Sequence, residues 1–349
     1  MVLVGERVYE GMNPNNLAPG VIVQLESRQA RNISEHTYER QYVAVGDESD
    51  PKERKILNDD FDMWEAEILL NDEQWPVPHR RNNYETNPAM EYFYNKFPAL
   101  GSMREWFTLV PSARALYPMQ RLHDAARVFP GHKEVDAWAM NIFKNAIDSI
   151  ALRSRARIMK QIELRIAERS SEQELVIVSL GCGAAVPVLD AVVAMRDQYG
   201  KSAHVSLYDQ DKDVLDFAGE LAGEEDISIP EKDRHVGSYT EAFKLPPESV
   251  DIVDALGLWE YLPDKRCREL LADAYVLLKP GGSIIVSNML SSRRQLEFNR
   301  RAIGWPGVKP RSEDQLVDIV HDAGIDTSLL TFTTSEDGVY AVMEIRKPL

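Results

Sequence analysis

The most constraining feature of this sequence is a short apolar run, Leu175–Leu180 (LVIVSL), that leads directly into Gly181-Cys182-Gly183. A run of this length fits a strand that is buried on both faces, and glycine lets the chain turn tightly beside a ligand. Further apolar runs follow at Ala203–Tyr208, Val250–Val253 and Ser283–Ser287, with amphipathic stretches between them. Strands that alternate with helices at this spacing indicate a mostly parallel sheet covered by helices.

The pattern changes near the C-terminus. Leu316–Ala323 is predicted to be a helix that Gly324 ends. Two strand-like runs follow, Leu329–Thr334 and Val339–Arg346, and the residues between them include Asp337-Gly338. Because Asp-Gly between two such runs favours a hairpin, we predict an α/β fold: a Rossmann-like, doubly wound, mostly parallel sheet with a terminal antiparallel hairpin.

The first half of the chain gives weaker signals, and we predict a largely helical N-terminal region. Ala137–Glu168 is predicted to be a long helix with at most one break, because isoleucines recur in it at helical spacing. The basic residues of this helix fall largely off the apolar stripe. We interpret them as a solvated face rather than as a phosphate site; they are Arg153, Arg155, Arg157 and Lys160.

Composition excludes several classes of protein. The 349 residues carry 40 Lys and Arg against 56 Asp and Glu, a net charge of −16, so nucleic acid and anionic membranes would repel the chain at long range. Cys182 and Cys267 alone cannot form a disulfide framework or a four-ligand zinc site, and we predict no metal centre. No apolar segment approaches the roughly 18 residues that span a membrane. We expect a soluble, cytoplasmic protein.

An acidic residue ends the second predicted strand. Asp209 lies 28 residues after Gly181, at a place where dinucleotide-binding folds use a carboxylate to bind ribose hydroxyls. The alternative is that Asp209 caps the following helix, although Asp211 can fill that position.

Taken together, these motifs make the chain from about residue 158 to 348 resemble the class I S-adenosylmethionine-dependent methyltransferases. Five features occur in the order found in that family. They are Leu180-Gly181-Cys182-Gly183, Tyr208-Asp209-Gln210-Asp211, Val250-Asp251-Ile252-Val253 with the loop Leu258–Asp264, Leu277-Leu278-Lys279-Pro280-Gly281-Gly282, and the terminal hairpin.

The resemblance implies a seven-stranded sheet and S-adenosyl-L-methionine as the co-substrate. It places three groups of residues around this methyl donor. Gly181, Cys182, Gly183 and Ala185 would line the methionine end, Asp209 and Gln210 would hold the ribose, Ser238 and Tyr239 would flank the adenine, and Asp254, Ala255 and Leu256 would lie at the edge of the methyl-transfer site.

The sequence departs from the family pattern at three positions. Ser179 stands where the family often has Asp or Glu, which removes one polar contact to the methionine amine, and Ala185 replaces a third glycine. Ser238 occupies a position that is often acidic. A Rossmann dehydrogenase fits less well, because residue 186 is Val instead of the glycine that close packing under a pyrophosphate favours.

The candidate catalytic residues are Glu260, Tyr261 and His235. Glu260 and Tyr261 follow the fourth strand of the predicted domain, where each could also be structural, and His235 could reach the adenine edge or be exposed. His123 and His132 are weaker candidates, while Trp259 and Trp305 would border an acceptor pocket or pack in the core. We interpret Cys182 as a small residue that fills the loop.

We predict three regions: residues 1–136 as a mostly helical, substrate-covering part, 137–170 as a connecting helix, and 171–349 as the Rossmann-like domain that binds the methyl donor. The function we predict is transfer of a methyl group to a small organic molecule, for example a secondary metabolite, by in-line displacement. The aromatic-rich segment Trp75–Phe97 would enclose a partly apolar or aromatic acceptor, or form N-terminal core. A donor-binding protein without catalysis and a protein methyltransferase that docks its partner on the N-terminal region are the alternatives. We expect no nucleic-acid or membrane partner, and the oligomeric state stays open, a homodimer included.

Overall fold

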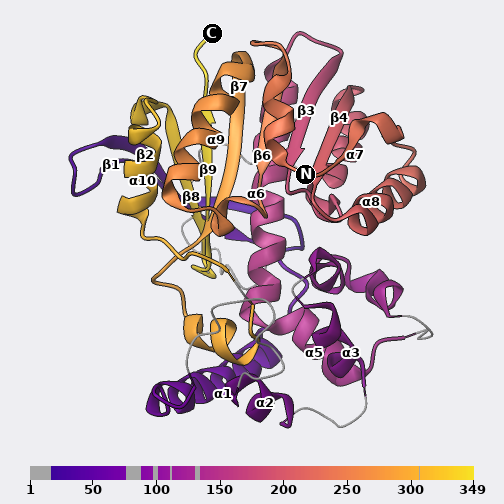
Figure 1. Cartoon of the computed structure of the whole chain (residues 1–349), viewed down its shortest axis with the longest axis vertical. Helices are drawn as coiled ribbons and strands as arrows, with labels where there is room; N and C mark the ends of the chain where they lie inside the picture. Colours follow the sequence, from indigo (N-terminus) through magenta and orange to yellow (C-terminus); the bar gives the residue numbers. More distant parts are fainter. Residues whose placement is uncertain (1–16, 76–87, 97–100, 111, 130–133, 306) are drawn as a thin grey trace.

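A twisted sheet with helices on both faces forms the centre of the molecule (Figure 1). The computed structural model describes residues 17–75, 88–96, 101–110, 112–129, 134–305 and 307–349. Within these residues the sheet has nine strands, in the order β1-β2-β8-β9-β7-β6-β3-β4-β5. The strands are β1 (Ile22–Arg31), β2 (Thr37–Val45), β3 (Glu174–Leu180), β4 (Ser202–Asp209), β5 (Arg234–Val236), β6 (Val250–Ala255), β7 (Leu278–Met289), β8 (Leu330–Ser335) and β9 (Tyr340–Arg346).

The seven strands from β3 to β9 form the predicted doubly wound sheet. Strand β3 lies between β4 and β6 and pairs with both in parallel, and β6 continues in parallel to β7. Only β9 runs antiparallel to its neighbours β7 and β8. The predictions of a mostly parallel α/β sheet and of a terminal hairpin are therefore confirmed.

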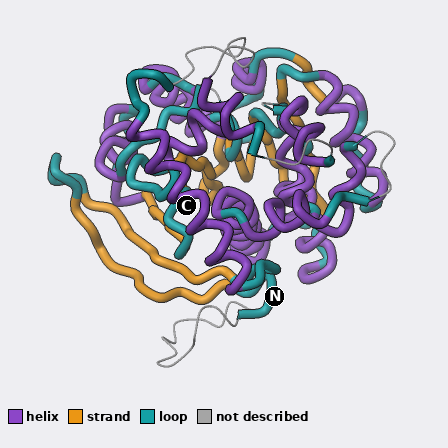
Figure 2. The backbone as a smooth tube through the Cα atoms, turned by 90° about the horizontal axis from the view of Figure 1, so that it is seen from below, coloured by secondary structure: helices purple, strands orange, loops and turns teal. Residues whose placement is uncertain are grey.

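Strands β1 and β2 extend this sheet beyond the seven predicted strands. They form an antiparallel hairpin, and β2 adds to β8 in parallel. Figure 2 shows the hairpin as a long ribbon along one rim of the molecule. Near its tip, Asn32 donates a 2.7 Å hydrogen bond to Asp318. The N-terminal region is thus helical in large part but also contributes two strands to the sheet.

The core lies in two layers, because successive residues of a strand point to opposite faces. Ile177 and Ile252 pack toward α6, α7 and α8, whereas Val178 and Val253 pack toward α9 and α10. These five helices are α6 (Ile147–Arg169), α7 (Val186–Tyr199), α8 (Lys212–Glu224), α9 (Asp264–Leu277) and α10 (Glu313–Asp322).

The N-terminal helices gather at one end of the sheet, and α6 runs from them to its centre (Figure 1). They are α1 (Pro51–Leu70), α2 (Pro88–Tyr94), α3 (Ser102–Leu109), α4 (Tyr117–Gln120) and α5 (Ala137–Asn145). Shorter helical turns complete the fold: η3 (Ala113–Leu116), η4 (Leu122–Val128), η5 (Glu231–Asp233), η6 (Tyr239–Lys244), η7 (Trp259–Tyr261), η8 (Phe298–Ala302) and η9 (Thr327–Leu329). Among the described helices, none is long and apolar enough to cross a bilayer.

The predicted long helix is broken once, at Ala146, between α5 and α6. The interpretation of its basic residues as a solvated face is wrong for Arg153 and Arg155, each of which is 4% exposed. Arg153 pairs with Asp47 at 2.7 and 2.8 Å and donates to three backbone carbonyls. Helix α6 is surrounded by protein on nearly every side, so even residues off its apolar stripe are buried.

Candidate active site

The loop after β3 has the backbone conformation that its glycines predict. Gly181 and Gly183 have φ angles of +59° and +55°, which strongly favour glycine. A Cβ atom on Gly181 would lie 2.7 Å from the Cβ of Leu258, and one on Gly183 would lie 2.8 Å from the Cβ of Ala113. Ala185 ends the loop at φ +54°, in the left-handed region and without glycine's freedom. The two glycines therefore let neighbouring segments approach the loop closely.

The carboxylate of Asp209 meets this loop from β4. Its Oδ2 accepts a 2.9 Å hydrogen bond from the backbone N–H of Gly183, and its Oδ1 accepts one from the N–H of Asp211. Burial raises the pKa of Asp209, while these backbone donors oppose the shift. Asp211 caps α8 through Asp213 and Val214. The alternative in which Asp209 is the helix cap is therefore wrong.

A cleft of about 1170 Å³ opens at the carboxyl ends of the parallel strands, beside the crossover between β3 and β6. Ligands of open α/β sheets bind at such a switch point. Every residue predicted to contact the methyl donor lines this cleft except Ala255, which is fully buried in β6. The residues that line the cleft and that the sequence predicted to contact the methyl donor are Gly181, Cys182, Gly183, Ala185, Asp209, Gln210, Ser238, Tyr239, Asp254 and Leu256.

Ser179 and Asp254 line the cleft, and Glu163 of α6 is buried close to Asp254. Ser179 and Asp254 are register partners on β3 and β6, and the Ser179 hydroxyl donates to Asp254 Oδ1 at 2.8 Å. Asp254 Oδ2 and both carboxyl oxygens of Glu163 have no hydrogen-bond partner among the described residues. Burial raises the pKa of Asp254 to about 7. Burial and then the charge of Asp254 raise the pKa of Glu163 well above its ordinary value.

A second cavity, of about 70 Å³, adjoins the cleft on the side of the N-terminal helices. Its walls are mostly apolar and aromatic and include Phe61, Trp106, Met289 and Phe298. The two spaces share five lining residues: Leu116, Arg155, Gly257, Tyr261 and Trp305. The cavity and the cleft therefore adjoin each other at these residues.

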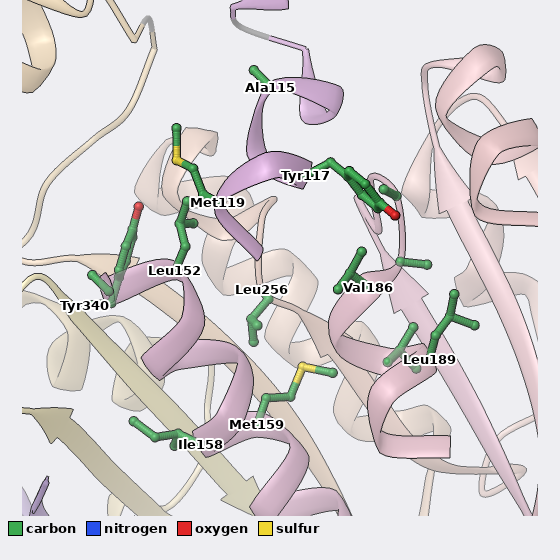
Figure 3. Close-up of a cluster of buried hydrophobic side chains, with 14 of the residues drawn as sticks. Ala115, Tyr117, Met119, Leu152, Ile158, Met159, Val186, Leu189, Leu256 and Tyr340 are labelled. Carbon is green, nitrogen blue, oxygen red and sulfur yellow. The ribbon is translucent and has the colours of Figure 1, made fainter. Parts of the chain in front are cut away.

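The segment of η3 and α4 forms the roof of this site. Figure 3 shows Tyr117 above Val186 of α7, and Met119 beside Leu152 of α6. Leu116 lines both the cleft and the cavity, and Ser112, Ala113 and Gln120 line the cleft. This part of the N-terminal region covers the end of the Rossmann-like fold where the loop after β3 lies.

Two buried charges lie opposite each other beside the small cavity, where Arg155 lines both spaces and Glu260 lines the cavity alone. Arg155 of α6 and Glu260 of η7 are 4% and 3% exposed, and Arg155 Nη1 lies 3.5 Å from Glu260 Oε1. Arg155 also lies over the Tyr340 ring, with Cζ 4.3 Å from the ring centroid. Burial raises the pKa of Glu260, and the charge of Arg155 opposes that rise.

The three predicted catalytic residues lie in different surroundings. Glu260 lines the small cavity, and Tyr261 lines both spaces and accepts a hydrogen bond from Trp305 Nε1. His235 lies on β5, stacks on Tyr208 with ring centroids 4.3 Å apart, and lines neither space. The structure therefore brings Glu260 and Tyr261 together and leaves His235 apart from them.

The weaker candidates also separate. Trp305 borders the site, whereas Trp259 is fully buried in the core. His123 is exposed on η4, and His132 lies outside the described residues. Burial, followed by the charges of Asp209 and Asp254, raises the pKa of Cys182 well above its ordinary value, which keeps the thiol protonated.

The aromatic-rich segment does not line the site where it is described. Trp75, Tyr92 and Phe93 pack against one another, and Phe93 also packs against Phe298. Sequence analysis missed Arg155, which lines both spaces. One sequence feature pointed to Arg155: three arginines lie close together in a helix with a regular apolar stripe. The sequence could not show that the whole helix is buried, because that burial depends on the complete fold.

Comparison with protein families gives one match. Residues 177–282 match the model of a family described as a methyltransferase domain. No curated protein matches the sequence.

Comparison with solved structures identifies the fold. A protein from Bordetella parapertussis described as a possible exported protein superimposes with a TM-score of 0.53 at 18% identity, over 85% of this chain and 96% of that one. Magnesium protoporphyrin IX methyltransferase from Synechocystis PCC 6803 gives a TM-score of 0.41 at 13% identity, over 72% of this chain and 100% of that one. Mitomycin 7-O-methyltransferase gives 0.41 at 15% identity, over 71% and 76%. The first likeness shows a shared fold, and nothing further is drawn from the other two.

The strand order, the glycine loop with its neighbouring carboxylate, and the matched residues 177–282 agree with one another. Together they show that this chain carries a methyltransferase domain of the class I, S-adenosylmethionine-dependent family.

Proposed function

We propose that this protein is an enzyme that transfers a methyl group from S-adenosyl-L-methionine to a small organic molecule. The observation that carries the proposal is the adjacency of two spaces: residues expected to bind the donor line the cleft, and the cleft shares five lining residues with a mostly apolar cavity. At about 1170 Å³ the cleft slightly exceeds the usual range of roughly 300–1,000 Å³ for ligand pockets. That volume is consistent with a cleft that holds the donor together with part of an acceptor.

Asp254 supports donor binding despite the serine at position 179. A carboxylate is expected near the methionine ammonium. Asp254 lines the cleft one strand away from Ser179, and its Oδ2 has no hydrogen-bond partner among the described residues. In this proposal Asp254 accepts from the ammonium, while Asp209 accepts from the ribose hydroxyls. Such bonds to a charged group are each worth about 1.5–3 kcal/mol. The carboxylate of Asp254 therefore argues against the alternative that this fold no longer binds the methyl donor.

The donor supplies a methyl group on a sulfonium sulfur, and the chain's own residues must position the acceptor in line with it. Leu116, Tyr261 and Trp305 lie where the cleft meets the cavity and would hold the acceptor there. Positioning of two reactants in this way can supply roughly 7–11 kcal/mol of the barrier. Described residues of α1, α3 and η8 line the cavity, which has a volume of about 70 Å³. A space of this size supports a small-molecule acceptor over a protein side chain on its backbone.

Calorimetry tests this function. We expect S-adenosylmethionine and its demethylated product both to bind the full-length protein, and an acceptor library to yield a methylated small molecule detected by mass spectrometry. Absence of donor binding would overturn the proposal. Donor binding with no methylated product from any small molecule would favour the protein that binds without catalysis, and methylation of a polypeptide would favour the protein methyltransferase. A cytoplasmic location stays a prediction, for which cell fractionation is the measurement.

A further inference from the structure

The Arg155–Glu260 pair is poorly satisfied for an ion pair so deeply buried. Arg155 Nη1 makes two contacts at the outer limit of hydrogen bonding, 3.5 Å to Glu260 Oε1 and 3.4 Å to Ser287 Oγ. Arg155 Nε and Glu260 Oε2 have no partner among the described residues. A buried charge without hydrogen bonds costs several kcal/mol, so these unused positions need an explanation.

Arg153, two residues earlier on the same helix, shows what a purely structural arginine looks like here. Its guanidinium binds Asp47 through two hydrogen bonds of 2.7 and 2.8 Å and donates to the carbonyls of Met119, Phe143 and Lys144. Arg153 lines neither the cleft nor the cavity, whereas Arg155 lines both. The difference points to a ligand group as the missing partner of Arg155 and Glu260.

The two charges restrict what that group can be. A carboxylate would be attracted by Arg155 but repelled by Glu260, and an ammonium group would face the opposite conflict. A hydroxyl satisfies both, because it donates to the carboxylate and accepts from the guanidinium. The rest of the cavity wall is apolar and rich in rings, including Phe61, Trp106 and Tyr340, which suits a ring on that hydroxyl.

We propose that the methyl acceptor is a ring-bearing, largely apolar molecule with an acidic hydroxyl, a phenol or an enol, and that it is methylated on this oxygen between Arg155 and Glu260. This inference rests on the proposed function and deepens it. The hydroxyl of the acceptor and the role of Arg155 go beyond the sequence predictions, which named only a partly apolar or aromatic acceptor and Glu260.

Arg155 and Glu260 together account for the proton and the charge in the methyl-transfer step. The O–H bond of the acceptor breaks and its proton passes to Glu260 Oε2. The oxygen's electron pair forms the bond to the donor methyl carbon, and the carbon–sulfur bond breaks with its pair left on sulfur. Arg155 stabilises the oxyanion before transfer, and Glu260 is neutral afterwards. The products are the methyl ether and the demethylated donor.

Three probes of nearly equal size test the inference without turnover: 4-nitrophenol, 4-nitroaniline and 4-nitroanisole, each titrated into the protein saturated with the demethylated donor. We expect 4-nitrophenol to bind at least tenfold more tightly than the other two, with the visible absorbance of its phenolate. Equal affinities, absence of binding, or preference for the aniline would overturn the proposal. Because saturation with the demethylated donor is measured first, failure of the proposed function is seen separately.

Two variants assign the roles. Arg155→Met should abolish the preference for 4-nitrophenol and the phenolate absorbance, and Glu260→Gln should lower methyl transfer by 10²–10⁴-fold, the usual worth of a general base. Arg157→Met is the matched control, because Arg157 is on the same helix and lines neither space. Thermal melts and binding of the demethylated donor verify that each variant is folded. An Arg155→Met protein that binds the donor and keeps the full preference for 4-nitrophenol would refute the proposal, and the wild-type probe comparison stands even where a variant fails to fold.

Discussion

Ser179 donates a 2.8 Å hydrogen bond to Asp254 Oδ1 across the junction of β3 and β6, whereas Asp254 Oδ2 has no hydrogen-bond partner in the part of the chain that the structure describes. The two strands meet where the sheet reverses its strand order, beside the cleft. The class I methyltransferases often have a carboxylate at the position of Ser179 on β3. In this chain a carboxylate lies instead on the neighbouring strand β6, at Asp254. This relationship determines how donor binding should respond to pH.

We predict that donor affinity falls in acid through Asp254. Its pKa of about 7 in the free protein means that half of the carboxyl groups are protonated at pH 7, and about 97% at pH 5.5. Because a nearby ammonium binds only the ionised form, affinity should drop by more than tenfold from pH 7 to pH 5.5, as measured by calorimetry with the demethylated donor.

Asp254→Asn should bind weakly at pH 7 and lose most of this pH dependence. Asp216→Asn is the control, since Asp216 is exposed on α8 and does not line the cleft. A wild-type affinity that does not change over this range would remove Asp254 from the donor site.

A second prediction concerns stability and Glu163. Burial raises the folded-state pKa of Glu163 above its ordinary value, so the folded state holds the proton more tightly than the unfolded state does. Stability from this group is therefore present below about pH 4.5 and is lost as the pH rises toward the raised value. Glu163→Gln should be more stable than wild type at pH 7.5 and nearly equal to it at pH 4.

Urea unfolding at the two pH values measures this difference. Glu168→Gln, an exposed change on the same helix, should show no such divergence between pH 4 and pH 7.5. A Glu163→Gln protein that is less stable at pH 7.5 would mean that the ionised carboxylate has a favourable partner.

Asp209→Ala should weaken donor binding by roughly ten- to a hundredfold, because the variant loses a hydrogen bond to a charged group worth about 1.5–3 kcal/mol. The same carboxylate fixes the loop through Gly183 N–H, so the loss should appear with both the donor and its demethylated product. Calorimetry beside Asp216→Ala provides the comparison. Unchanged affinity for both compounds would show that the ribose is held elsewhere.

Gly183→Ala should lower both stability and donor affinity. Residue 183 has a φ angle of +55°, and an added Cβ would lie 2.8 Å from Ala113 in the covering segment. Gly200→Ala is a well-matched control, since Gly200 has a φ of +64° but open space around it. Both should cost about 1 kcal/mol of stability for the backbone, and only Gly183→Ala should reduce donor affinity. Equal donor affinities of the two variants would argue against close contact between the loop and its cover.

The fold of the C-terminal half was predictable because its signals are local. Buried parallel strands read as continuous apolar runs, such as Leu175–Leu180, and Asp337-Gly338 indicates its hairpin within a few residues. Strands β1 and β2 lacked such signals, because β1 is largely exposed and pairs only with its hairpin partner. Addition of β2 to β8, nearly 300 residues later, depends on the complete sheet.

The site shows the same division. Gly181, Gly183 and Asp209 could be placed in the cleft from their positions at strand ends. Arg155 could not, because periodicity describes one face of a helix and cannot show that protein surrounds the other faces. The conformation of the loop that holds Cys182 depends on residues next to one another in the sequence. The pair formed by Arg155 and Glu260, in contrast, joins residues 105 positions apart.

Helix α6 carries both Arg155, which lines the small cavity, and Glu163, which is buried close to the carboxylate of Asp254. Eight residues of helix separate them, an axial spacing of about 12 Å. In the proposed reaction, one continuous helix therefore fixes the distance between the acceptor end and the donor end of the site. Substitutions in η3, α3 or α4 should change which acceptor is bound without changing that distance.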